Sequence, residues 1–113
     1  MGLFDYHVHV AIGPQAPAVR YVCWFHKTEE MERHGEDERR RGFCAHRDGF
    51  CPVIWLPRRP RTAREHATLA HEAFHAVGHI TRWAAIAHTE QTEEVFCHAL
   101  GHLVNGILDG AKR

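Results

Sequence analysis

The chain has 113 residues, enough for one domain with a single modest core. Its 14 basic and 14 acidic residues cancel, so no electrostatic surface for nucleic acid or for an anionic membrane is expected. The start of the chain lacks the pattern of a signal peptide, and no apolar run approaches the roughly 20 residues that cross a bilayer. We therefore expect a soluble, cytoplasmic protein that forms one domain and has no nucleic-acid or membrane partner.

Histidine is the outlying residue type, with 12 copies in the chain. It is the commonest metal ligand and it titrates near neutral pH, so its excess favours metal chemistry. The chain also has four cysteines, which would remain reduced in the cytoplasm. We expect them to be free thiols or metal ligands. They are Cys23, Cys44, Cys51 and Cys97.

Apolar residues alternate with polar ones from Leu3 to Ile12, which predicts a half-buried strand. The apolar face would carry Val8 and Val10, and the polar face would carry His9. Gly13 and the prolines after it end this strand. The chain is therefore expected to open with a strand at the boundary of the core.

Three further segments complete the first half. Val19–Phe25 is a second candidate strand. Residues 27–41 carry charges of both signs and no apolar stripe, which predicts a solvated helix or a loop. Phe43–His46 and Phe50–Leu56 flank a glycine-containing turn and predict a β-hairpin. Residues 1–60 are thus expected to form strands and loops.

A helix is predicted from about Ala63 to Trp83. Thr62 and Glu65 form a capping box, in which each side chain can bind a backbone amide of the first turn. An apolar stripe at helical spacing should face the core. It comprises Leu69, Ala73, Ala76, Val77, Ile80 and Trp83.

A second helix is predicted after a link near His88. Its apolar pattern runs from Val95 to Leu108, and Gly110 ends it. Residues 61–113 would then be a helix pair. The expected fold class is α+β, a small antiparallel N-terminal sheet packed on two C-terminal helices.

The predicted first helix contains His71-Glu72-Ala73-Phe74-His75, an HExxH motif. His71 and His75 lie one turn apart on one face, so both imidazoles can bind one ion, while Glu72 reaches a metal-bound water. Zinc lowers the pKa of such a water to about 7, and Glu72 would take its proton as it attacks a carbonyl. The motif predicts a zinc-dependent hydrolase.

Catalytic zinc usually has three protein ligands, so a third is needed. Glu94 opens the second helix and follows His75 after 18 intervening residues, a separation that an antiparallel helix pair can close. Glu93 and Glu90 would replace it if the helix starts in another register. Acids in a first helical turn also favour the helix dipole without any metal.

These residues resemble the gluzincins, in which a second helix donates a glutamate to an HExxH zinc site. The spacing from His71 to Glu94 looks like that of their aminopeptidase branch, and residues 50–108 are similar to very small metallopeptidases of phages and bacteria. The resemblance implies a minimal zincin-like fold, one catalytic zinc and a peptide or protein substrate. It also implies that the strand Val53–Leu56 is a sheet edge that aligns the substrate.

The chain departs from related patterns in two ways. Metzincins carry a third histidine where this chain has Thr81, and His79 comes two residues too early, so it could bind the same ion only if Gly78 broke the helix. Large gluzincins also stabilise the oxyanion from another domain. His98 or His102 would have to take that role or support a ligand here.

A second, structural zinc is a weaker hypothesis. Cys23, His26, Cys44 and Cys51 offer enough ligands, but their spacing is irregular and contains no CxxC pair. Buried, reduced cysteines are the simpler interpretation.

Two functions remain from different classes. One is a zinc metallopeptidase with Glu72 as general base, and hydrolysis of another kind of amide is not separable from it. The alternative is a non-catalytic interaction or regulatory module that zinc stabilises. Glu72 favours the enzyme, because a structural site does not need a carboxylate between its histidines. The oligomeric state is not predicted.

Overall fold

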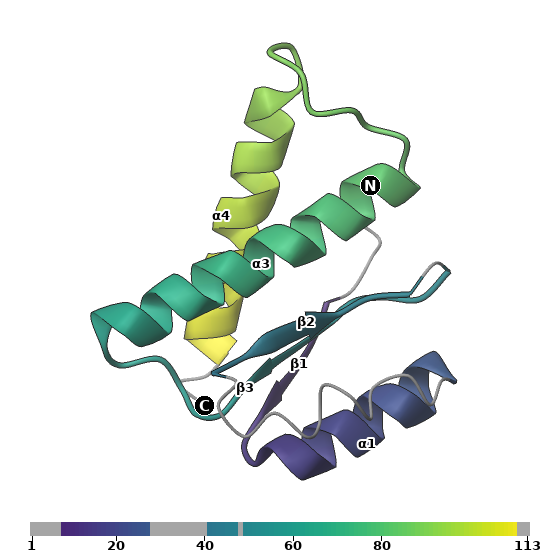
Figure 1. The fold of residues 1–113 in the computed structure, drawn as a ribbon. Helices are drawn as coiled ribbons and strands as arrows, with labels where there is room; N and C mark the ends of the chain where they lie inside the picture. The colour runs from purple at the N-terminus through teal and green to yellow at the C-terminus, as the bar shows by residue number, and fades with distance from the viewer. Residues whose placement is uncertain (1–7, 28–40, 48, 111–113) are drawn as a thin grey trace.

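The computed structural model describes residues 8–27, 41–47 and 49–110. It confirms the α+β class, with a small sheet formed by the first half of the chain and long helices in the second (Figure 1). Residues 3–7 of the strand predicted over Leu3–Ile12 and residues 28–40 of the charged segment predicted over 27–41 lie outside the described residues. The elements are β1 (His9–Ile12), α1 (Gln15–His26), β2 (Phe43–Ala45), β3 (Val53–Leu56), α3 (Ala63–Trp83) and α4 (Glu93–Gly110).

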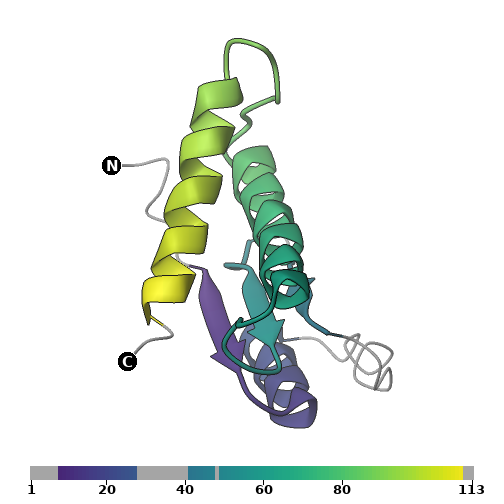
Figure 2. The same ribbon diagram turned by 90° about the vertical axis from the view of Figure 1, so that its left-hand side faces the viewer.

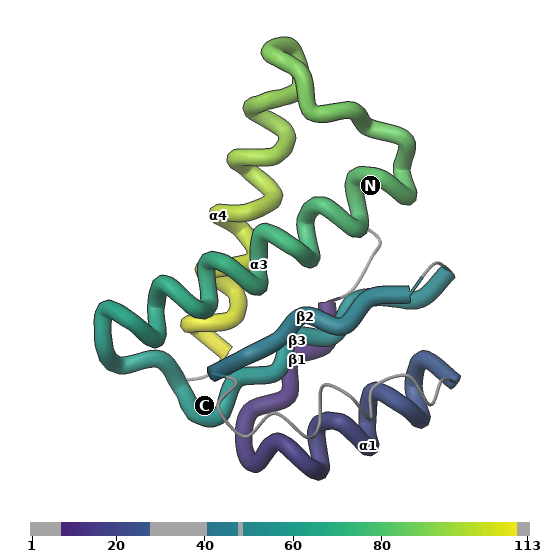
Figure 3. The backbone as a smooth tube through the Cα atoms, in the orientation of Figure 1, coloured from purple at the N-terminus to yellow at the C-terminus, as the bar shows by residue number. Residues whose placement is uncertain are grey.

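The sheet has three strands in the order β1-β3-β2. The predicted hairpin is confirmed, with shorter strands: β2 pairs antiparallel with β3, and Cys44 faces Ile54 across the pair. The expectation of a wholly antiparallel sheet is wrong, because β1 pairs parallel with β3, from His9 opposite Val53 to Ile12 opposite Leu56. A parallel pair needs a long connection, and α1 lies in the connection between β1 and β3 (Figure 3).

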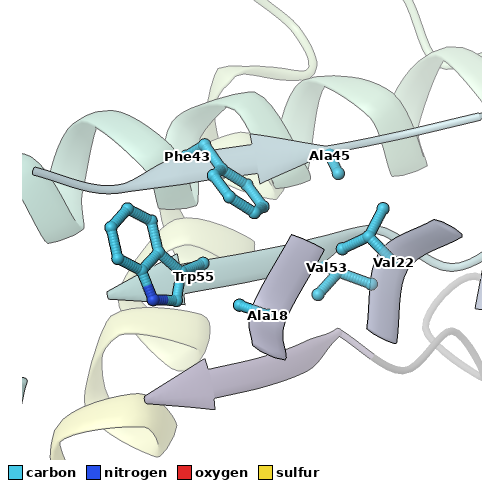
Figure 4. Packing of buried hydrophobic residues seen from close by; sticks show 6 residues of the cluster. All are labelled: Ala18, Val22, Phe43, Ala45, Val53 and Trp55. Carbon is cyan, nitrogen blue, oxygen red and sulfur yellow. The ribbon is translucent and has the colours of Figure 1, made fainter. Parts of the chain in front are cut away.

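Helices cover both faces of the sheet (Figures 1 and 2). On one face, α1 packs on alternate residues of β2 and β3, including Phe43 and Trp55 (Figure 4). On the other face, α3 and α4 pack on Ile54 and Leu56. No residue of β3 is more than 2% exposed, so this strand lies at the centre of both clusters.

The predicted strand Val19–Phe25 is wrong, because this segment belongs to helix α1. Its buried residues Ala18, Val22 and His26 recur at helical spacing, which the alternation of aromatic and β-branched residues concealed in the sequence. Pro17 is compatible with this helix, since it lies in the first turn, where a backbone N–H has no helical acceptor.

The predicted faces of β1 also need correction. His9 lies against α1, where its Nδ1 is 2.7 Å from the Tyr21 hydroxyl and its ring is 4.3 Å from that of Phe25. Val10 remains 38% exposed. The prediction assumed a sheet with one solvent-exposed face, whereas helices cover both faces of this sheet.

Helix α3 confirms its predicted bounds and its cap. The Thr62 hydroxyl accepts from the Glu65 amide at 3.1 Å, and the Glu65 carboxylate accepts from the Thr62 amide at 3.0 Å. The predicted apolar stripe is buried up to Ile80, but Trp83 is 55% exposed. The cap fixes where the helix starts, and Leu69, Ala73 and Ala76 fix which side faces the sheet.

Helix α4 crosses α3 instead of running along it (Figure 1). Residues from its second half pack against the cluster that contains Leu69 and Ala73 of α3; they are Leu100, Leu103, Val104, Ile107 and Leu108. Its first turns lie at the end away from the sheet (Figure 1). Within the described part of the chain, no helix has the length and apolarity that a membrane crossing requires.

Gly42, just before β2, is expected to tolerate no side chain. A Cβ there would lie 2.9 Å from Thr68 Cγ2 and 3.1 Å from the Trp55 carbonyl oxygen, so Gly42→Ala would push β2 away from α3. We expect a loss of about 1–3 kcal/mol in the free energy of unfolding, measured by urea titration. The control is Gly101→Ala in α4, where nothing lies within 4 Å and a small gain is expected. Equal midpoints for the two variants would contradict this packing.

The capping carboxylate of α3 should make the free energy of unfolding depend on pH in the acidic range. The Arg58 side chain, followed by the amides of Thr62 and Arg61, lowers the pKa of Glu65 from 4.5 to about 2. The folded state therefore binds fewer protons, and the stabilisation is complete above pH 4.5 and is lost as the pH falls towards 2. The gap in urea midpoint between wild type and Glu65→Gln should narrow over this range. A gap independent of pH would refute the assignment.

Candidate metal centre

The HExxH motif lies in the middle of α3, where one turn presents two different environments. His71 and His75 point to solvent and are exposed. Glu72 lies about 100° around the helix and is only 8% exposed. Ala73 and Ala76 are buried against the sheet and α4, and this packing sets the orientation of α3. The same orientation turns the imidazoles outward and the carboxylate inward.

The three side chains are close enough to share one ion. One ligand atom from each side chain lies within 4.8 Å of the ligand atoms of the other two. Among the described residues, this is the one group of at least three His, Cys, Asp or Glu side chains close enough to hold one metal ion. The two imidazole Nε2 atoms are 3.2 Å apart. Two nitrogen ligands in a tetrahedral zinc site would be about 3.3 Å apart, so the histidine pair fits zinc with little rearrangement.

Cys44 is a neighbour of the centre that the sequence did not predict. It lies in β2 on the face turned towards α3, opposite to the face that carries Phe43 and Ala45. Burial, and secondarily the charge of Glu72, raises the pKa of the Cys44 thiol to about 12. The thiol is therefore neutral at physiological pH and gives Glu72 an uncharged neighbour. Strand alternation within the hairpin could have indicated this position.

The structure does not bring Glu94 to the histidines. Its carboxylate is 84% exposed and lies 3.2 Å from Nε2 of His98, one turn further along α4. The α4 residues that pack on the cluster around Leu69 begin at Leu100, and Leu103 is about 13 Å along the helix axis from Glu94. Glu93 and Glu90 are also exposed and are not part of the group of three. The third ligand therefore stays a prediction.

The other predicted site residues lie apart from the group of three. His79 is buried, and its Nε2 donates to the Phe50 carbonyl at 3.2 Å, so it ties α3 to the hairpin. Thr81, at the metzincin position, is buried and donates to the Val77 carbonyl. His98 and His102 are exposed on α4.

The four residues considered for a second zinc do not converge on one point. Cys23 packs in the cluster on the α1 face of the sheet, whereas Cys44 packs on the opposite face. His26 is buried and donates from Nε2 to the Cys51 carbonyl at 2.8 Å. Burial, the main cause, lowers the pKa of His26. These contacts give His26 a structural role, in docking the end of α1 on the hairpin.

No protein-family model, curated protein or solved structure matches the chain. The resemblance to gluzincins therefore depends on the residues of the motif. One implication of that resemblance needs correction: Val53–Leu56 is the central strand of the sheet, not an edge. Of the two edge strands, β2 has the more extensive contact with α3.

We expect the purified protein to bind about one zinc ion per chain, and His75→Ala to lose it, because the single imidazole that remains in the motif makes a weak site. Elemental analysis after dialysis gives the stoichiometry, and competition with a chelator gives the affinity. The control is His102→Ala, which removes an exposed histidine outside the group of three. Zinc retained by His75→Ala would refute this centre.

The same titration tests the third ligand. If Glu94 binds the ion when α4 approaches, Glu94→Gln should weaken zinc binding at least tenfold while Glu93→Gln has little effect. Equal affinities for both variants would exclude Glu94.

Proposed function

We propose that this protein is a zinc-dependent hydrolase, most simply a metallopeptidase. The observation that carries the proposal is the position of Glu72. Its carboxylate lies within 4.8 Å of both imidazoles but on the buried flank of the helix. This separation suits a base that acts through one water molecule beside an ion that the two histidines hold.

Each residue of the candidate metal centre would have a separate role in hydrolysis. Zinc, when bound, supplies the Lewis acidity that polarises a carbonyl and makes water more acidic. Glu72 would accept the proton of the attacking water and pass it to the leaving amine. The Cys44 thiol, whose pKa is raised to about 12 by burial and by the charge of Glu72, would stay uncharged and so add no second negative charge near the carboxylate. His71 and His75 are exposed, so a substrate can approach directly from solvent.

The alternative function, a module that zinc stabilises, is less compatible with this geometry. A structural ion stabilises a small fold by joining segments that are distant in the chain. His71, Glu72 and His75 all lie in α3, so an ion held by them alone joins no two elements. Participation of Glu94 would join α3 and α4, and the chelator titration of Glu94→Gln described above therefore bears on this alternative as well.

The proposed substrate is a peptide or protein segment in an extended conformation. The edge strand β2 packs on α3 and carries Cys44, whose thiol interacts electrostatically with Glu72, so the outer edge of β2 is the place where an extended segment would pass near the base. Other amides would meet the same catalytic groups. The chemistry proposed is thus amide hydrolysis, with peptides as the first class to test.

Glu72→Gln should abolish most hydrolysis but retain zinc. Loss of a general base typically costs 10²- to 10⁴-fold in rate, and we expect a fall of roughly that size in kcat on unfolded casein, followed by mass spectrometry. Glu93→Gln is the matched control, since that carboxylate is exposed on α4. A zinc-loaded Glu72→Gln variant as active as the wild type would eliminate the proposed mechanism.

A further inference from the structure

The outer side of α3 continues beyond the two histidines. At 100° per residue, His71, His75, Gly78 and Arg82 fall within an arc of about 60° around the helix axis. These four residues form what we call the strip, which places a glycine and then a guanidinium in line with the candidate metal centre. Arg82 is exposed, and its charge plays no part in the chemistry described so far.

The Arg82 side chain folds back towards the histidines. Its Nη1 atom lies 3.4 Å from the point where a Cβ on Gly78 would stand. Side chains of a helix lean towards its N-terminus, so the Arg82 side chain leans towards His75. Arg64 lies on the same side of α3 but precedes His71, so its side chain would lean away from the two histidines. Gly78 and His75 are three residues apart and so are neighbours at about 5–6 Å. The guanidinium thus lies about one turn from His75.

The described carboxylates that form ion pairs do so with residues other than Arg82, so its guanidinium can bind a ligand. Among the described residues, the carboxylates that form ion pairs are those of Glu65, with Arg58, and Glu94, with His98. Glu72 lies on the buried flank near Cys44. Within the part of the chain that the structure describes, no carboxylate pairs with Arg82. An exposed guanidinium beside a hydrolytic site is suited to bind an anionic group, in bidentate fashion if that group is a carboxylate.

Phe74 adds an apolar surface to the same site. It precedes His75 and is 53% exposed, which is unusual for a phenylalanine in a helix that packs on a core. It lies at the border of the strip, about 60° from His71. The candidate metal centre is thus flanked by an aromatic ring on one side and by a cation further along the helix.

We propose that Arg82 binds a carboxylate of the substrate one or two residues from the cleaved bond, and so makes the enzyme selective for acidic segments or chain ends. The separation follows from the rise of about 3.3 Å per residue in an extended peptide, set against one helical turn between His75 and the guanidinium. The carboxylate would be either an Asp or Glu side chain or a C-terminal carboxylate. This inference rests on the proposed function.

The first experiment compares cleavage by the zinc-loaded full chain. The probes are synthetic peptides of one sequence that contains a site cut in casein, with Glu or Gln near the bond and with a free or amidated C-terminus. We expect kcat/KM to be about tenfold higher for the peptides that carry the carboxylate, and this advantage to vanish in Arg82→Gln. Arg64→Gln is the matched control and should retain the advantage. The Glu/Gln and acid/amide pairs distinguish the two sources of the carboxylate.

The second experiment measures binding without turnover. In the zinc-loaded Glu72→Gln protein, calorimetry should give a Kd about tenfold lower for the acidic peptides than for their amides, and Arg82→Gln added to that protein should equalise them. Equal cleavage and binding of all peptides by the wild type would overturn the role of Arg82 and leave the hydrolase intact. If nothing is cleaved, the hydrolase proposal fails, and the binding comparison with unmodified casein segments still decides whether Arg82 recognises carboxylates.

Discussion

The fold depends on the burial of one short strand. β3 lies between β1 and β2, and its four side chains alternate between the two faces of the sheet. Val53 and Trp55 bind α1 from one side, while Ile54 and Leu56 support α3 and α4 on the other. Each fully buried side chain of this size contributes about 1.5–3 kcal/mol, so this strand supports the attachment of every helix in the described part of the chain.

That constraint also determines the geometry of the candidate metal centre. α3 can place Leu69, Ala73 and Ala76 against Ile54 and Leu56 in one rotational setting, and the capping box fixes its start. The histidines must then face outward and Glu72 must face β2. The difference in exposure between the imidazoles and the carboxylate therefore follows from core packing, in metal-free protein as well. A site organised before the ion binds loses less free energy on ordering its ligands.

Local patterns predicted the second half of the chain well. The capping box and apolar stripe define α3 through interactions within a few residues of one another, and the hairpin has its own turn. The α1 segment failed because Val22 and its aromatic neighbours satisfy both a period of two and a helical period, and only packing on Val53 and Trp55 favours the helix. The parallel pairing of β1 likewise depends on a partner more than 40 residues away. Long-range contacts of this kind leave no local pattern.

The same difference between local and long-range interactions applies to the site. His71, Glu72 and His75 lie within one turn, so helix periodicity alone brings them together. Glu94 depends on how α4 crosses α3, which is set by Leu100 and the residues after it and not by the spacing in the chain. An antiparallel alignment and a crossing both satisfy the apolar pattern of α4. Helix periodicity therefore predicted that His71, Glu72 and His75 lie together, but the spacing in the chain could not predict where Glu94 lies.

A site on the outside of a single helix has consequences for how it can select a substrate. Deep pockets bind by enclosing their ligand, whereas the buried apolar side chains of the described residues pack together on the two faces of the sheet. Recognition must then come from groups that reach a substrate lying along the surface. Charged side chains on the same strip and exposed aromatic residues act at that range, because neither requires enclosure. Under the proposed function, the exposure of the imidazoles, which is unusual for a structural zinc site, would allow a surface-bound peptide to reach the ion and the base together.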